Sequence, residues 1–428
     1  MNNQLAQWEN IMERYVIHGG RRLDGQLNIQ SSKNAVLPII AGAILTDEQV
    51  VIKNCPKIKD VFAMLDILTH LGAKWSFDEE NLIINSSSID KYSIPQNLAG
   101  ELRSSIFMLG ALISRLKRAR IFFPGGCDIG LRPIDMHLSA LSDLGIIISD
   151  INGELNCISN QIVGRNICLD FPSVGATENI ILASVFAKGK TQIFNPAKEP
   201  EIVDLMNFLN SMGAKIYGAG TSTILIEGVK SLHGTEYTPI PDRIECGTYL
   251  IATAIAGGQV QLNNCSAKNI SLLVHKLCDN TCKISINNDI IYIKSGSVRK
   301  NFSFTTGPYP MFPTDLQAQA TSLLTVCGGV SVVSENVFEM RFRHIPELIK
   351  MGANIIVKGK NAIITGVERL NGAIVGANDL RGGAALVLAG LNAEGETIVN
   401  NVNHIERGYF QMDKKLSSIG ADIIKQTF

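Results

Sequence analysis

Apolar and polar positions along the chain follow a pattern that recurs six times. In each copy, leucines at helical spacing lead into a turn, which contains glycine in five of the six, and a short apolar run typical of a strand follows. The copies begin about 70 residues apart, so six of them account for almost the whole chain. They are LTHLGAKWSF at 68–77, LSDLGIIIS at 141–149, LNSMGAKIYG at 209–218, LCDNTCKISI at 277–286, LIKMGANIIV at 348–357 and LSSIGADIIK at 416–425.

The first copy indicates the local structure of all six. Its apolar residues between 61 and 71 fall on one face of a helix, and Gly72 can end that helix in the left-handed conformation that glycine adopts at little cost. Another strand-like run precedes most copies, as in QVVIKNC at 49–55 and QVQLNNC at 259–265. Each unit is therefore predicted to be strand, loop, helix, turn and strand, which places the chain in the α/β class.

Six units favour two groups of three. One unit cannot bury its own apolar face, whereas three packed together can. The segment TPIPDRIECGT at 238–248 lies near the midpoint and carries two prolines, so we interpret it as the crossing between domains. The alternative is a continuous solenoid, which is disfavoured because solenoid repeats usually have about 20–50 residues.

Composition and charge exclude several classes of protein. Apolar residues make up 46% of the 428 positions and charged residues 18%, which is typical of a globular enzyme. The 39 basic residues balance the 39 acidic ones, so the chain offers no general nucleic-acid surface. The apolar stretch at 35–45 is too short to cross a membrane.

The cysteines indicate reduced thiols. There are nine, an odd number without a disulfide framework, and the first fifteen residues are polar rather than a signal peptide. Cys278 and Cys282 have no second ligand pair for zinc, so buried thiols are the favoured interpretation and no metal site is predicted. Together these features predict a cytoplasmic protein.

The loops between strand and helix differ from copy to copy and are where function is expected. The strongest motif is PGGCDIGLRP at 124–133, a glycine-rich loop that carries Cys127 in its middle and Arg132 five residues later. A thiol near a cation and a helix start has a lowered pKa and can act as nucleophile or proton donor. An exposed but idle cysteine is the alternative that the loop alone leaves open.

Many ordered motifs make the chain similar to the enolpyruvyl transferases that act on UDP-N-acetylglucosamine, from about residue 15 to the C-terminus. They are SKNAVLPI at 32–39, PGGCDIGLRPIDMH at 124–137, PSVGATENI at 172–180, EPEIVD at 199–204, PDRIECGTY at 241–249, FPTDLQAQ at 312–319 and ERGY at 406–409, together with the six-unit layout.

The resemblance implies a fold and a reaction. The fold is two similar domains, each of three βαβαββ-type units in an inside-out α/β barrel: residues 33–240, and residues 15–32 plus 241–428, with 1–14 as an extension. The reaction transfers the enolpyruvyl group of phosphoenolpyruvate to the 3-hydroxyl of UDP-N-acetylglucosamine and releases phosphate, which opens peptidoglycan synthesis. It needs no metal and no cofactor, and we expect no nucleic acid, membrane or obligate protein partner.

The resemblance also implies roles for individual residues. Cys127 matches the reactive cysteine that protonates C3 of phosphoenolpyruvate. Lys33, Arg132 and Arg407 match cations that hold this substrate. Asp315 matches the carboxylate beside the sugar 3-hydroxyl and is expected to be the base, with a purely structural helix cap as the alternative.

Further residues match the surroundings of the two substrates. Asn34 matches a contact to the nucleotide sugar, while Arg103, Arg381 and Glu199 match polar residues of the cleft. Those on the UDP side are Arg132, Pro133, Ile134, Asp135, Met136, Ser173, Val174 and Val337.

Some features depart from the family or compete with this interpretation. Ser31 and Ser32 stand where the family often has Gly-Ala, and Gly382-Gly383 where many members have Ala-Ser. The triplet GKT at 189–191 suggests a phosphate loop, but it lacks the first glycine of that motif and runs into a strand. The shikimate-pathway enolpyruvyl transferase and an inactive paralogue that only binds UDP-sugar are the alternative functions.

Overall fold

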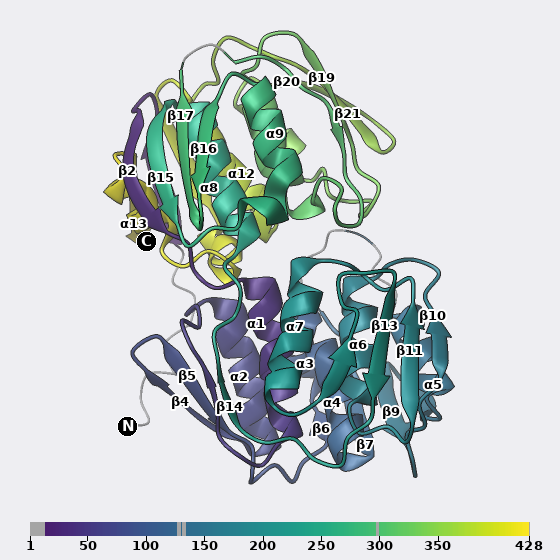
Figure 1. Ribbon diagram of the computed structural model, residues 1–428. Helices are drawn as coiled ribbons and strands as arrows, with labels where there is room; N and C mark the ends of the chain where they lie inside the picture. Colours follow the sequence, from purple (N-terminus) through teal and green to yellow (C-terminus); the bar gives the residue numbers. More distant parts are fainter. Residues whose placement is uncertain (1–12, 126–129, 131–133, 297–298, 428) are drawn as a thin grey trace.

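The computed structural model describes residues 13–125, 130, 134–296 and 299–427. They form two halves, one above the other in Figure 1, each with its own hydrophobic core. The first core is formed by residues between Ala35 and Leu232, and the second by residues 15–29 together with 244–423. We call the elements around these cores the first half and the second half. The predicted α/β class with six repeated units is confirmed, whereas the domain limits remain a prediction.

Each half has three sheets of four strands, and all six sheets follow one plan. The first two strands in each sheet are parallel, and the other two neighbouring pairs are antiparallel. The sheets of the first half are β14 (Thr235–Tyr237), β3 (Val50–Ile52), β5 (Asn81–Asn85), β4 (Lys74–Asp78); β6 (Ser93–Ile94), β7 (Arg118–Phe122), β9 (Glu154–Ile158), β8 (Ile147–Ile151); and β10 (Asn166–Cys168), β11 (Lys190–Phe194), β13 (Thr223–Glu227), β12 (Lys215–Tyr217). Those of the second half are β2 (Leu23–Asn28), β15 (Gly258–Asn263), β17 (Ile290–Ser295), β16 (Lys283–Asn287); β18 (Phe304–Thr305), β19 (Val330–Ser334), β21 (Asn361–Thr365), β20 (Asn354–Lys358); and β22 (Ile374–Gly376), β23 (Glu396–Asn400), β1 (Glu13–His18), β24 (Asp422–Thr427).

Helices pack against the sheets of each half. In the first half they are α1 (Lys33–Gly42), η1 (Ala43–Leu45), α2 (Lys59–Leu71), α3 (Gln96–Ala99), η2 (Arg103–Ile106), α4 (Phe107–Leu116), α5 (Asp135–Asp143), α6 (Val174–Ser184) and α7 (Pro200–Ser211). In the second half they are α8 (Arg243–Ala256), η3 (Ala267–Ile270), α9 (Ser271–Asp279), η4 (Thr314–Leu316), α10 (Gln317–Leu324), α11 (Ile345–Lys350), α12 (Leu380–Gly390), η5 (Val402–Arg407) and α13 (Met412–Ser418).

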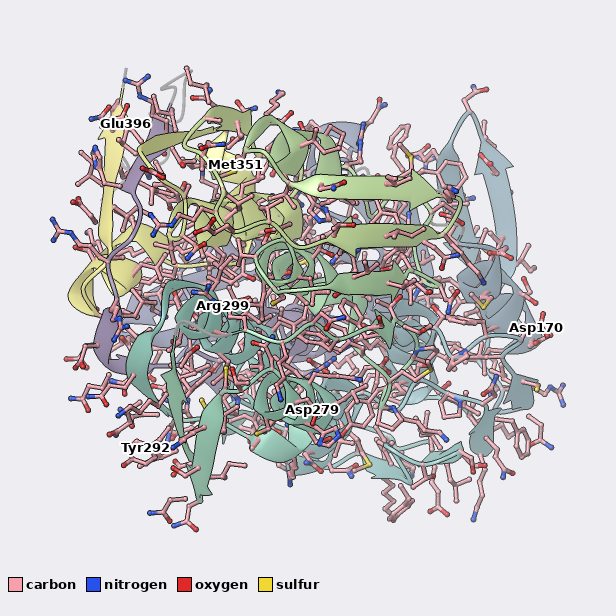
Figure 2. All side chains as sticks on the ribbon, turned by 90° about the horizontal axis from the view of Figure 1, so that it is seen from above. Asp170, Asp279, Tyr292, Arg299, Met351 and Glu396 are labelled. Atoms are coloured by element: carbon pink, nitrogen blue, oxygen red, sulfur yellow. The ribbon has the colours of Figure 1, made fainter. Side chains whose placement is uncertain are left out.

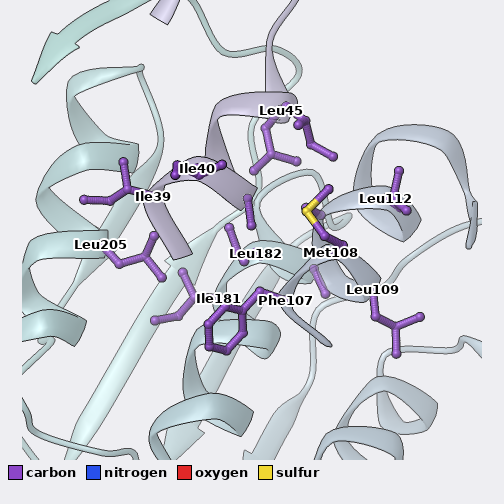
Figure 3. Close-up of a cluster of buried hydrophobic side chains, with 14 of the residues drawn as sticks. Ile39, Ile40, Leu45, Phe107, Met108, Leu109, Leu112, Ile181, Leu182 and Leu205 are labelled. Carbon is purple, nitrogen blue, oxygen red and sulfur yellow. The ribbon is translucent and has the colours of Figure 1, made fainter. Parts of the chain in front are cut away.

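Central helices are buried on almost every side, which is the reverse of a barrel with helices outside. In the first half α1, α4 and α6 hold this position, and in the second half α8, α10 and α12. A helix that is apolar around its whole circumference is stable only when it is buried. Figure 3 shows side chains such as Ile40, Met108 and Leu182 from three of these elements packed together. Gly110 permits the close contact of α4 with α6, since a Cβ there would lie 2.3 Å from Asn179 Oδ1.

The chain crosses between the halves twice, and the two crossings lie side by side. Strands β1 and β2 pair with β23 and β15 of the second half, so residues 13–28 belong to that half before the chain enters α1. The Ser32 amide donates to the Ile240 carbonyl at 2.8 Å, and the Asp242 amide donates to the Gln30 carbonyl at 2.8 Å. Both serines of the Ser31-Ser32 pair are buried within this double crossing.

The six predicted turns between helix and strand are confirmed. All five glycines at these turns have positive φ, from 86° at Gly145 to 105° at Gly72. Thr281 of the fourth copy also adopts a positive φ, 81°, so this unit keeps the turn despite having a β-branched residue there. The GKT triplet forms no phosphate loop, since Lys190 and Thr191 already lie in β11.

The outer faces of the sheets carry exposed side chains, among them Tyr292 and Glu396 at the margin of Figure 2. Within the described part of the chain, none of the helices combines the length and the apolar character needed to cross a membrane. The same residues contain no group of three or more His, Cys, Asp or Glu side chains suited to hold a metal ion.

Candidate active site

A carboxylate with three nitrogen donors lies where the two halves meet. Asp315 Oδ1 accepts from Arg341 Nη2 at 2.7 Å, and Oδ2 accepts from Arg381 Nη2 at 3.0 Å. Asn34 of the first half donates to Oδ2 at 3.3 Å. The Asp315 side chain is 26% exposed, whereas each arginine is only 4% exposed. The cluster therefore joins four parts of the chain. Asp315 lies in η4, Arg341 in the loop that precedes α11, Arg381 in α12 and Asn34 in α1.

The environment keeps Asp315 ionised. Burial by itself would raise the pKa of Asp315, but the guanidinium groups of Arg381 and Arg341 outweigh it and hold the pKa well below its usual range. Neither η4 nor α10 has a side-chain cap bond, so the interpretation of Asp315 as a helix cap is wrong. The carboxylate is instead the anion of a buried ion cluster.

A second carboxylate, Asp60, lies between two of the predicted substrate cations. Lys33 Nζ lies 2.6 Å from Asp60 Oδ2, and Arg407 Nε lies 2.8 Å from Oδ1. Burial opposes the ionisation of Asp60, yet Lys33 and Arg407 bring its pKa below the usual value. Because Arg407 comes from η5 in the second half, Asp60 in α2 connects the halves. The Arg407 guanidinium also donates to the carbonyl of Glu101 at 3.2 Å.

The first turn of α8 fixes the backbone of this region. Asp242 caps α8 by accepting from the amides of Ile244 and Glu245 at 2.8 and 2.9 Å. Its other oxygen accepts from the backbone amide of Lys33 at 3.1 Å, so the cap also anchors the start of α1. Glu245 accepts from the amide of Gln30 at 2.9 Å. Lys33 is therefore placed by the crossing as well as by its side chain.

Two acidic residues at the start of α7 form a further contact between the halves. Arg243 makes a two-point ion pair with Glu201 at 2.9 and 3.2 Å, and both side chains are buried. Glu199 accepts from the Tyr309 amide at 3.3 Å, and burial raises the pKa of Glu199. Neither oxygen of the buried Glu178 has a hydrogen-bond partner among the described residues. Burial, reinforced by Glu201 and Glu199, raises the pKa of Glu178 well above its usual value.

The geometry suits a doubly charged anionic substrate bound beside a carboxylate. Lys33, Arg407, Arg341 and Arg381 converge from both halves, and arginine and lysine are the side chains that bind phosphate and carboxylate groups. The sequence profile of the family described as EPSP synthase (3-phosphoshikimate 1-carboxyvinyltransferase) matches residues 17–416. The chain belongs to this family.

Relatives within the family are similar over nearly their whole length. The chain is 50% identical over 415 residues to the UDP-N-acetylglucosamine 1-carboxyvinyltransferase 2 of Caldanaerobacter subterraneus subsp. tengcongensis, covering 97% of this chain and 100% of the relative. It is 46% identical over 414 residues to the UDP-N-acetylglucosamine 1-carboxyvinyltransferase 1 of Clostridium acetobutylicum, covering 96% of this chain and 99% of the relative.

Solved structures of the family have the same fold. The enolpyruvyl transferase NikO from Streptomyces tendae superposes with a TM-score of 0.87 at 25% identity, covering 98% of this chain and 100% of that one. EPSP synthase from Acinetobacter baumannii superposes with a TM-score of 0.74 at 16% identity, covering 97% of this chain and 100% of that one. At that identity the second likeness concerns the fold alone.

The glycine-rich loop of the family lies only partly within the described residues. Cys127, Arg132 and Pro133 fall outside them, so the predictions for these three remain untested. Gly130 is described and approaches the second half, since a Cβ there would lie 2.5 Å from Glu339 Oε2. Gly130 therefore lies beside the segment that leads to Arg341.

The described residues predicted for the UDP side come from three segments, at the starts of α5 and α6 and after β19. Ile134 is buried and precedes α5, which begins with Asp135 and Met136, and Met136 packs against the first core. Ser173 caps α6, its hydroxyl accepting from the Ala176 amide at 3.3 Å, and Val174 packs against the first core.

Two more predicted residues lie at loop positions. The amide of Val337 donates to Glu335 Oε1 at 2.8 Å, so Val337 belongs to a tight turn after β19. Arg103 begins η2 on the way to α4. The roles of all these residues remain predictions.

The sequence did not indicate the role of Asp60 between two cations, nor the ion pair that Arg243 forms with Glu201. Asp60 follows Lys57 and Lys59 at a helix start in CPKIKDV at 55–61, but nothing in that segment links it to Lys33 or Arg407. Arg243 and Glu201 lie within the motifs PDRIECGTY and EPEIVD, but 42 residues separate them and no periodicity links them.

Proposed function

We propose that this chain is a UDP-N-acetylglucosamine 1-carboxyvinyltransferase, which transfers the enolpyruvyl group of phosphoenolpyruvate to the sugar 3-hydroxyl for peptidoglycan synthesis. The observation that carries the proposal is the ionised Asp315 between the halves, with Asn34, Arg341 and Arg381 as its donors. The choice of UDP-N-acetylglucosamine as the acceptor is supported by the names of the similar relatives.

The proposed reaction has two balanced steps. In the addition, the 3-oxygen of the sugar forms a bond to C2 of phosphoenolpyruvate, its proton passes to Asp315, and Cys127 donates a proton to C3. In the elimination, the bond from C2 to the phosphate oxygen breaks, C3 loses a proton, and the double bond is restored. This chemistry requires an acid at C3 and a base at the sugar hydroxyl.

The low pKa of Asp315 limits how it can act. A base is most effective when its pKa is near the working pH, and two guanidinium groups keep Asp315 far below that. We propose that Arg341 or Arg381 turns toward an anionic group of the substrate, which weakens one ion pair and raises the proton affinity of Asp315. Asp315 then orients the hydroxyl first and accepts its proton later.

We propose that Lys33, Arg132 and Arg407 bind the phosphate and carboxylate of phosphoenolpyruvate. Asp60 keeps Lys33 and Arg407 near one another, because both cations form ion pairs with its carboxylate. The substrate would share these cations with Asp60. Arg103, Glu199 and the residues of the UDP side are proposed to complete the cleft.

The two halves are proposed to be domains, residues 33–240 and residues 15–32 plus 241–428, which close on the substrates. The contacts of Asn34 with Asp315 and of Arg243 with Glu201 support this division, since both join the two cores through polar groups. We also propose a cytoplasmic location, where both substrates are expected and thiols stay reduced.

A second candidate is the transfer to shikimate 3-phosphate, because the family profile carries the name of that enzyme. The relatives at 45–50% identity favour the nucleotide sugar. An inactive paralogue is opposed by the presence of the residues that the reaction is proposed to use, which are Lys33, Cys127, Arg132, Asp315 and Arg407.

Steady-state phosphate release tests the proposal. The enzyme is mixed with phosphoenolpyruvate and either UDP-N-acetylglucosamine or shikimate 3-phosphate. We expect release with the nucleotide sugar alone. Release only with shikimate 3-phosphate would establish the second candidate, and release with neither would leave the inactive paralogue.

A further inference from the structure

Two buried thiols touch behind the first turn of α8. Cys246 Sγ lies 3.2 Å from Cys265 Sγ, and the two residues are 1% and 3% exposed. Cys246 lies in α8, and Cys265 lies between β15 and η3. Neither cysteine is among the residues proposed to bind the substrates.

The backbone on both sides of the pair is held in place. The Cys265 amide donates to the Asp289 carbonyl at 2.7 Å, and the neighbouring Asn264 side chain donates to the Ile29 carbonyl at 2.8 Å. On the other side, Cys246 continues the turn that Asp242 caps, and its own amide donates to the Asp242 carbonyl at 3.0 Å. The thiols therefore stay opposite one another, so their effective concentration is high.

Only a small movement separates the contact from a covalent bond. A disulfide has a sulfur–sulfur distance of about 2.05 Å, so the two atoms must approach by roughly 1.2 Å. Rotation of two side chains about their Cα–Cβ bonds can supply a shift of this size. We propose that Cys246 and Cys265 are an oxidisable pair that closes to a disulfide when the protein meets a peroxide.

The chemistry balances with hydrogen peroxide as the oxidant. The sulfur of one thiol attacks a peroxide oxygen, and the thiol proton passes to the departing oxygen, which gives a sulfenic acid and one water. The second thiol attacks the sulfenic sulfur and forms the sulfur–sulfur bond, and its proton leaves with the displaced hydroxyl as a second water. In total, two thiols lose two hydrogens and the peroxide is reduced to two waters.

The pair is linked to the scaffold of the proposed site. Glu245, next to Cys246, accepts from the Gln30 amide, and Asp242 accepts from the Lys33 amide. A disulfide would tie this first turn of α8 to the loop after β15. The inference does not depend on the proposed function, because it concerns two thiols and an oxidant.

The chain offers a matched control in Cys55. The strand-like runs QVVIKNC and QVQLNNC end in Cys55 and Cys265, which are 2% and 3% exposed. Burial alone raises the pKa of the Cys55 thiol, whereas the hydrogen bond to Cys265 and, after it, burial raise the pKa of Cys246. Cys55 therefore has the burial of the pair without the neighbouring sulfur, and Cys168 and Cys278 are exposed controls.

The sequence gives a direct readout. Arg243 and Lys268 are consecutive trypsin sites, so one peptide, residues 244–268, carries both cysteines. The folded full-length protein is treated with hydrogen peroxide, then denatured, alkylated and digested with trypsin. The masses of the peptides are measured by mass spectrometry. We expect this peptide to lose two hydrogens, to take up no alkyl group, and to regain two alkylation sites after reduction. Cys55 should remain fully alkylated.

A variant and a stability measurement sharpen the test. Cys265→Ser should abolish the loss of two hydrogens, and oxidised wild-type protein should melt a few degrees higher because the disulfide constrains the unfolded chain. Peptide 244–268 with both thiols intact, at an exposure that fully oxidises Cys168 and Cys278, would overturn the proposal. A disulfide that forms only in denaturant, or that persists in Cys265→Ser, would overturn it as well.

Discussion

Replacing Asp315 by asparagine separates its electrostatic role from its catalytic one. Asparagine keeps one oxygen acceptor but removes the charge, and its amide group then faces one of two guanidinium groups. Arg341 and Arg381 are each 4% exposed and would lose their shared anion. The change therefore affects both the stability of the second half and the reaction.

The cost in stability follows from the burial of the cluster. Removing one partner of a fully buried ion pair costs about 3–5 kcal/mol, and the 26% exposure of Asp315 together with the remaining acceptor lowers this. We expect the Asp315→Asn variant to lose about 2–4 kcal/mol, or roughly 4–16 °C for a unit of 150–250 residues. Asp379→Asn is the matched control: Asp379 caps α12 at 2.9 Å to two amides, and asparagine caps about as well.

The effect on stability has a defined pH dependence. The pKa of Asp315 is lowered in the folded protein, so its stabilising contribution is complete above the unfolded pKa of about 3.9 and is lost as the pH falls further toward the folded pKa. The difference in melting temperature between wild type and Asp315→Asn should be full at pH 7 and shrink below about pH 4.

Turnover per folded molecule is the second measurement. It should fall at least about a hundredfold in Asp315→Asn, the low end for loss of a general base, while UDP-N-acetylglucosamine still binds. A variant that melts within a degree of wild type would refute the ion-cluster argument. Normal turnover per folded molecule would refute the base, and Asp379 would be the next candidate.

Four further predictions test other parts of the account. Asp60→Asn should raise the KM for phosphoenolpyruvate more than that for the nucleotide sugar, because Lys33 and Arg407 lose their common anion; a lower KM would show that Asp60 competes with the substrate. Glu178→Gln should be more stable than wild type at pH 8 and equal to it near pH 4, because the pKa of Glu178 is raised in the folded protein and wild type therefore loses stability as the pH rises; equal melting curves at pH 8 would contradict this. Cys127→Ser should nearly abolish turnover and sensitivity to the epoxide fosfomycin, whereas Cys127→Asp should keep some activity and resist the epoxide, and wild-type rates in the serine variant would refute the thiol's role. Hydrogen exchange in residues 124–132 should slow when UDP-N-acetylglucosamine is added, and an unchanged profile at saturation would argue against closure.

The repeated architecture could be predicted because each unit carries its own local signals. Leucine spacing, a turn glycine and a β-branched run recur in every copy except the fourth, and there Thr281 adopts the positive φ of the missing glycine. The return of β1 and β2 to the second half could not be derived from periodicity, since pairings such as Val16 with Ile398 join residues at opposite ends of the chain. The resemblance to a family supplied that connection.

Individual site residues could be named from motifs, but their partners could not. Asp315 was expected to act as a base or a cap, and only the fold brings it to Arg341, Arg381 and Asn34. Asp60 carries no motif of its own, and its importance comes from Lys33 and Arg407, which lie 27 and 347 residues away in the sequence. Such long-range electrostatic pairs depend on packing that no local pattern encodes.

The most direct test of the central claim is to follow the carbon of the donor. Phosphoenolpyruvate labelled with ¹³C in its three carbons is incubated with UDP-N-acetylglucosamine and the wild-type enzyme. The nucleotide sugars are then separated, and their masses are measured by mass spectrometry. The account predicts that the label appears in the UDP-sugar, joined to its 3-oxygen, with one phosphate released for each labelled product. Phosphate release without labelled UDP-sugar, or label found only in shikimate 3-phosphate when both acceptors are present, would contradict it.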